Sequence, residues 1–74
     1  MSYELTKSDK ITILNQHIKN LSMSEYNAKI SLTIENASMN PSQESISSFE
    51  LQIVNIGAQK RALEKELESL TNDE

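Results

Sequence analysis

The chain has 74 residues, with 7 Lys and Arg against 11 Asp and Glu, which gives a formal net charge of −4. This length is enough for one small domain. The absence of Cys excludes a disulfide framework, a thiolate nucleophile and a cysteine-ligated metal site, and it favours a cytoplasmic protein. Because the chain has no basic face, no signal-peptide pattern and no long apolar run, we expect neither nucleic-acid nor membrane binding.

The first half of the chain carries the pattern of one long helix. Thr6 is a suitable N-cap, and Asp9 follows it at the spacing of a capping box. Apolar residues then recur at heptad spacing on one face, which Glu25 interrupts. This seam consists of Ile11, Leu14, Ile18, Leu21, Ala28 and Leu32. The pattern predicts a helix over residues 7–36, preceded by a loose tail over residues 1–5.

The second half carries a stronger helical pattern. Asn40 is the expected N-cap, Pro41 the first helical residue, Gln43 the partner in a capping box, and Glu44 a favourable charge near the helix start. Seven of the eight heptad-spaced positions that follow are apolar, and the exception is Lys60. The seven are Ile46, Phe49, Ile53, Ile56, Leu63, Leu67 and Leu70. We expect a helix over residues 41–71, a loop over 37–40 and a loose tail over 72–74.

Two long helices joined by a short loop predict an antiparallel, coiled-coil-like helical hairpin that forms a single domain over residues 1–74. The sequence allows one alternative to this all-helical fold. Residues 29–35 and 49–53 also alternate in polarity like strands, which would give an α-β-β-α chain with a β-hairpin over residues 29–54. Against this alternative, a lone two-stranded hairpin is marginally stable, and it would leave the Asn40-Pro41 cap unused.

Each predicted helix also carries a second apolar stripe near the loop. The first stripe is Met23, Tyr26, Ile30 and Ile34, and the second is Leu51, Val54, Ala58 and Ala62. A two-helix hairpin buries one stripe per helix, so the other faces another chain or water. We therefore expect a homodimer, arranged as a four-helix bundle that closes mainly through the loop-proximal halves.

Three polar or small residues in these patterns have more than one interpretation. Glu25 and Lys60 either pair across the hairpin or a dimer, or extend separately into solvent. Gly57 is a tolerated helix defect, a kink, the site of a close helix crossing at a dimer interface, or the break between strand and helix in the α-β-β-α alternative. The hairpin register, which the sequence does not fix, decides whether Glu25 and Lys60 meet.

The residues give little support for catalysis. His17 is the single histidine and has no nucleophile or second ligand at a suitable spacing, so we expect no enzyme activity, no cofactor and no metal. The favoured hypothesis is a small protein-interaction module, an adaptor, modulator or inhibitor of another protein. Its contact residues are Met23, Tyr26, Ile30, Ile34, Met39, Leu51, Val54 and Ala58. The alternative is a structural coiled-coil subunit of a larger assembly.

Overall fold

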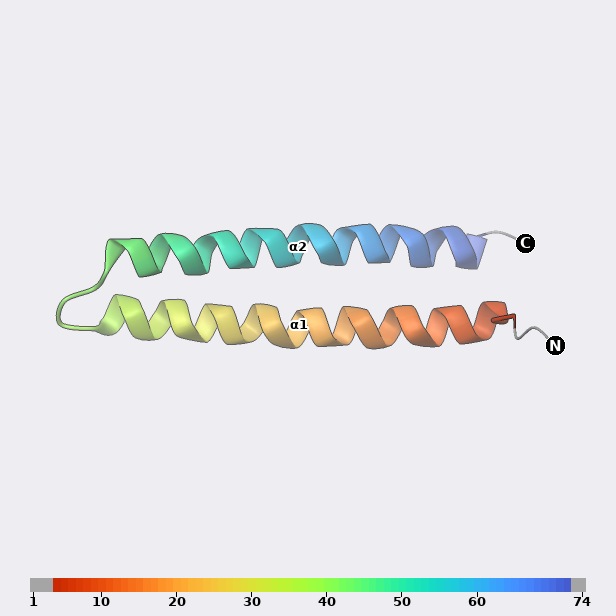
Figure 1. Cartoon of the computed structure of the whole chain (residues 1–74), viewed down its shortest axis with the longest axis horizontal. Coiled ribbons are helices and arrows are strands. Elements are labelled where there is room, and N and C mark those ends of the chain that lie inside the picture. The colour runs from red at the N-terminus through yellow and green to blue at the C-terminus, as the bar shows by residue number, and fades with distance from the viewer. Residues whose placement is uncertain (1–3, 73–74) are drawn as a thin grey trace.

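The chain is a hairpin of two long helices in a computed structural model that describes residues 4–72. Helix α1 spans Lys7–Ala37 and helix α2 spans Gln43–Asn72. They lie side by side and antiparallel, and the loop over residues 38–42 joins them (Figure 1). This confirms the helical hairpin. The α-β-β-α alternative is wrong, because the residues that alternate in polarity are helical and no segment of 4–72 is a strand.

The start of α1 follows the prediction. Thr6 is the N-cap, and its side chain accepts a hydrogen bond from the Asp9 backbone N–H at 3.0 Å. The Asp9 carboxylate in turn accepts from the Thr6 N–H at 3.0 Å, which completes the capping box. At the other end, α1 continues to Ala37, one residue beyond the expected end, and the hydroxyl of Ser38 donates to the Ile34 carbonyl at 3.0 Å.

The start of α2 differs from the prediction by two residues. The helix begins at Gln43, and Ser42 takes the N-cap position expected for Asn40, since its hydroxyl accepts from the Ser45 N–H at 3.2 Å. The Ser42 N–H donates to the Glu35 carboxylate at 2.8 Å, which ties the cap to the end of α1. Ser and Asn cap helices about equally well, so this contact with α1 is the physical reason for the shift. Pro41 therefore precedes the helix. Gln43 is the first helical residue and not the partner in a capping box.

The two ends of the chain differ in part from the predicted loose tails. Helix α2 continues through Asn72, so residue 72 belongs to the helix and not to the expected tail. Glu4 and Leu5 precede the Thr6 cap without regular structure. The remaining tail residues, 1–3 and 73–74, lie outside the described residues.

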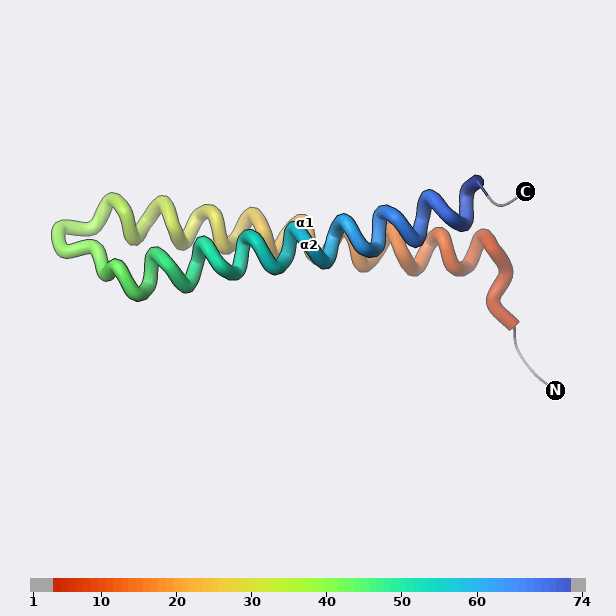
Figure 2. The backbone as a smooth tube through the Cα atoms, turned by 90° about the horizontal axis from the view of Figure 1, so that it is seen from above, coloured from red at the N-terminus to blue at the C-terminus, as the bar shows by residue number. Residues whose placement is uncertain are grey.

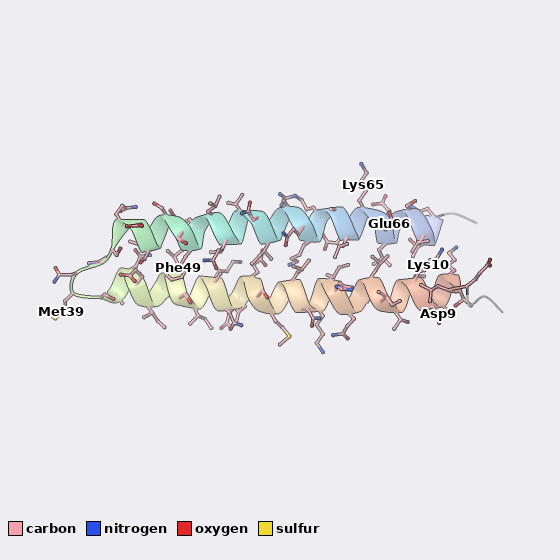
Figure 3. All side chains as sticks on the ribbon, in the orientation of Figure 1. Asp9, Lys10, Met39, Phe49, Lys65 and Glu66 are labelled. Atoms are coloured by element: carbon pink, nitrogen blue, oxygen red, sulfur yellow. The ribbon has the colours of Figure 1, made fainter. Side chains whose placement is uncertain are left out.

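The two helices pack along the predicted seam. Phe49 points from α2 toward α1 in Figure 3, and Figure 2 shows the helices crossing at a shallow angle. Every predicted seam residue is half-buried, except Ala28, which is buried at 5% exposure. The heptad pattern therefore identified correctly the face on which each helix packs.

The hairpin is long and thin. Its extents are 59 × 23 × 15 Å and its radius of gyration is 17.1 Å, whereas a compact chain of this length has a radius of about 11 Å. Among residues 4–72 only Ala28 is buried. The hairpin therefore has a half-buried seam between its two helices in place of a buried hydrophobic core.

Candidate interaction surfaces

The second apolar stripe of each helix is exposed. We define the α1 edge as Met23, Tyr26, Ile30 and Ile34, and the α2 edge as Leu51, Val54, Ala58 and Ala62. The side chains of the α1 edge are 40–66% exposed, and Leu51 and Val54 are 60% and 63% exposed. Single exposed apolar residues are ordinary, but a row of them along one helix face is a candidate interaction surface.

Both edges point directly away from the seam. Met23 lies two residues after Leu21 and two before Glu25, and two residues rotate a helix by about 200°. Leu51 has the same relation to Phe49 and Ile53. Lys65, which lies two heptads after Leu51, points away from α1 in Figure 3. The α1 edge and the α2 edge therefore lie on opposite sides of the hairpin.

Because the two edges lie on opposite sides of the hairpin, one contact with another molecule can cover only one of them. The two flanks between the edges are polar, with Ser22 and Ser31 on α1 and Ser45 on α2 half-exposed beside the seam. One two-fold contact between two hairpins covers the α1 edge or the α2 edge, because no single side of the molecule presents both. The edges are thus two separate surfaces.

Both edges lie in uncharged stretches near the loop. On the outer face of α1, residues 20–37 present only uncharged side chains, since Lys29 lies toward a flank, and Lys19 borders the edge one turn before Met23 in a hollow shared with Met23 and Tyr26. On the outer face of α2 the same holds for residues 47–58, where Glu50 lies toward a flank, and charge returns at Arg61, beside the last residue of the α2 edge. An uncharged apolar surface is typical of the central part of a protein–protein interface.

The two charged seam residues meet across the hairpin. Lys60 Nζ lies 3.3 Å from Glu25 Oε1, and each side chain is 21% exposed. The sequence left open whether these residues pair or separate, and the structure brings them together in one chain. The pair favours this register, because a slip of either helix by one turn would separate the two charges and leave them half-buried without a partner.

Gly57 lies on the inner side of α2 beside this pair. A Cβ built on Gly57 would lie 3.9 Å from Glu25 Oε2 and 3.4 Å from the guanidinium of Arg61. Gly57 therefore flanks the inner seam and is not part of the α2 edge, and its interpretation as a close crossing at a dimer interface stays a prediction. The kink is not observed, because α2 runs from Gln43 to Asn72 without a sharp bend (Figure 1). A polar notch opens at this point, lined by Glu25, Gly57, Lys60, Arg61 and Glu64.

The loop adds one exposed apolar residue to the candidates. Met39 lies at the tip of the loop, and its side chain is 99% exposed (Figure 3). It does not join either edge into a continuous surface, because it projects from the end of the hairpin. Met39 is thus separate from the other seven contact residues predicted from the sequence.

A further apolar groove, at the open end of the hairpin, was missed by the sequence reasoning. It is lined by Leu5, Lys10, Ile13, Leu14, Glu66 and Leu70. Leu5 and Ile13 remain 54% and 44% exposed. Leu5 directly precedes the Thr6 cap, and an apolar residue in that position commonly packs on the first turns of a helix. The sequence carries this signal at Leu5, which the predicted loose tail over residues 1–5 does not use.

His17 is exposed on α1. Within residues 4–72, no group of three or more His, Cys, Asp or Glu side chains is placed to hold a metal ion. Neither helix contains a stretch long and apolar enough to cross a membrane, over the same described part of the chain.

Comparisons with known proteins give no relative for this chain: no family model, no curated protein and no solved structure matches it. The geometry of the hairpin is therefore the basis for assigning a function.

Proposed function

We propose that this chain is a non-enzymatic protein-interaction module, an adaptor, modulator or inhibitor that binds another protein through the outer face of a helix. The observation that carries the proposal is the pair of exposed, uncharged apolar edges on a hairpin whose inner seam is already paired. The absence of Cys supports a location in the cytoplasm.

Covering an apolar edge would contribute favourably to binding. At about 25 cal/mol per Å², covering roughly 400 Å² of apolar surface contributes on the order of 10 kcal/mol of gross burial. Lost translational and rotational freedom offsets a large part of this gain. Met23 and Tyr26 are residue types that suit such surfaces, because Met adapts its shape and Tyr buries area while keeping a polar tip.

A photo-cross-linking experiment tests the proposal. We would replace Val54 with benzoylphenylalanine and irradiate the chain in an extract of the cells that produce it. The matched control carries the same group at Glu68, which lies two heptads later on the same side of α2, beyond the apolar edge. The expected result is one discrete adduct from position 54 and none from position 68. The Val54→Glu variant should then weaken binding of the identified protein by about tenfold or more.

Two outcomes would contradict the proposal. The first is the absence of a discrete adduct from position 54 and from an equivalent probe at Tyr26. The second is equal labelling from position 68, because that result would report random collision with the helix surface.

The placement of the edges on opposite sides also supports a second candidate function, that of a structural coiled-coil subunit of a larger assembly. A subunit with binding surfaces on two opposite sides can contact two neighbours at once, which a one-sided adaptor cannot do. Sedimentation velocity distinguishes the two functions. Species that grow continuously with concentration favour the structural subunit, whereas one discrete species favours the module.

A further inference from the structure

The hairpin exposes more surface than a compact monomer of its mass. Its accessible area is 5856 Å², whereas a compact 8.4 kDa protein exposes about 4600 Å². The excess is about 1200 Å², and a standard protein–protein interface covers about 800 Å² on each partner. One contact with a second molecule therefore supplies most of the burial that the isolated hairpin lacks.

The α1 edge is the better candidate for that contact. It presents four large side chains, whereas the α2 edge has two large side chains followed by Ala58 and Ala62. Burial stabilises a complex in proportion to the apolar area covered, so the same length of helix contributes more on the α1 edge.

The spacing of the α1 edge is close to symmetric. In a two-fold contact between antiparallel copies of one helix, each residue faces the residue equally far beyond the axis. With the axis near residues 28 and 29, Met23 lies opposite Ile34 of the partner subunit, and Tyr26 lies close to Ile30 of the partner subunit. Apolar side chains thus face apolar side chains along the whole edge, and the uncharged outer face of residues 20–37 matches itself.

Charge favours the antiparallel arrangement over a parallel one. The acidic residues Glu64, Glu66 and Glu68 lie toward the open end of α2. Antiparallel copies place these ends at opposite extremes of the dimer, whereas parallel copies place them side by side. Each chain carries a net charge of −4, so the antiparallel contact avoids the larger repulsion.

We propose that the α1 edge is covered by a second copy of this chain in a two-fold antiparallel contact centred near residues 28 and 29. The α2 edge is then left for a different protein. This assignment rests on the proposed function and deepens it, because it gives the two edges different partners. The dimer is longer than one hairpin, at about 80 Å, since the copies overlap only through their loop-proximal halves.

Disulfide cross-linking tests the assignment. The chain has no Cys, so a single introduced Cys reports one position. Asn27→Cys places a thiol next to the predicted axis, and Asn55→Cys is the matched control, since Asn55 is exposed beside Val54 as Asn27 is beside Tyr26. Under mild oxidation, the Asn27→Cys chain should form covalent dimers about tenfold faster or more than the Asn55→Cys chain. Equal rates, or faster linking through position 55, would overturn the assignment.

A second pair of variants keeps the test independent of the introduced thiol. Ile30→Glu should abolish the dimer and retain the helical circular dichroism signal, because Ile30 is 40% exposed in the hairpin. Val54→Glu on the opposite edge should leave the dimer intact. If Val54→Glu dissociates the dimer and Ile30→Glu does not, the assignment is wrong and the interaction module itself still stands. If the unmodified chain does not self-associate, the assignment fails alone, because photo-cross-linking at Val54 tests binding to a different protein.

Discussion

The seam and the outer edges of this hairpin are built from the same kinds of residue but differ in burial. Both contain large aliphatic and aromatic side chains at helical spacing, yet the seam is half-buried while the large side chains of the edges are 40–66% exposed. The difference lies in length. The seam runs from Ile11 to Leu32 on α1 and from Ile46 to Leu70 on α2, whereas each edge covers only the loop-proximal half. The long stripe of each helix is covered by the other helix, and the shorter stripe is left exposed.

The largest expected effect comes from shortening one side chain in each region of the same helix. Phe49→Ala should lower the free energy of unfolding by about 2 kcal/mol, roughly half the value for a fully buried Phe, because Phe49 is half-buried in the seam. Leu51→Ala, two residues later on the α2 edge, should change it by less than about 0.5 kcal/mol. Urea unfolding followed by circular dichroism at one fixed chain concentration measures both. Equal losses would show that the seam and the edge are not different regions.

The loop is expected to contribute about half as much as the Phe49 side chain. It sets the register, and the register decides which residues form the seam. Ser42→Ala removes the hydroxyl that accepts from the Ser45 N–H at 3.2 Å, and it should cost about 1 kcal/mol. Asn40→Ala, at the cap position that the sequence suggested, should have little effect. Thermal unfolding of the two variants compares them directly, and a larger loss from Asn40→Ala would mean that the helix starts at residue 41.

Gly57 and Ala58 are adjacent residues that test the inner and outer sides of α2. Gly57→Ala should stabilise the hairpin by about 0.5–1 kcal/mol, because Ala has the higher helix propensity and the added Cβ makes ordinary contacts at 3.4 Å and 3.9 Å. Ala58→Gly should destabilise it by a similar amount. Chemical denaturation of both variants gives the two values. A loss of stability in Gly57→Ala would mean that the notch beside Glu25 has no space for a methyl group.

The smallest expected effect is the coupling between the charged residues that interrupt the seam. The 3.3 Å pair of Glu25 and Lys60 is partly exposed, so its coupling energy should be about 0.5 kcal/mol. Lys60→Leu alone should lower stability, because it leaves the Glu25 carboxylate half-buried and unpaired. Changing both residues to Leu should restore or exceed the original stability. A double-mutant cycle measures the coupling, and additive effects of the two changes would show that the pair does not contribute.

Much of the fold followed from local patterns in the sequence. The Thr6 capping box, the seam residues and the existence of both helices depend on residues close together in the chain, and the structure confirms them. The start of α2 could not be placed correctly because it depends on a hydrogen bond from Ser42 to Glu35, seven residues earlier on the other helix. The pairing of Glu25 with Lys60 was undetermined for a similar reason, because it requires the register.

The surfaces were predicted less completely than the fold. Helical periodicity identified every large residue of the two edges as a face distinct from the seam, and each of them is exposed. Periodicity did not identify the groove at the open end, since Leu5 lies before the helix and reaches Ile13 and Leu70 only once both helices are packed. The positions of the two edges on opposite sides of the hairpin follow only when the seam is known to lie between them.

Sedimentation equilibrium of the unmodified chain over a wide concentration range tests most directly the claim that the outer edges bind protein and that one of them binds a second copy. We expect a reversible equilibrium between one chain of 8.4 kDa and a species of twice that mass, with no larger species at high concentration. A single chain at every concentration would contradict the self-association through the α1 edge. Unlimited growth with concentration would show instead that both edges bind further copies of this chain.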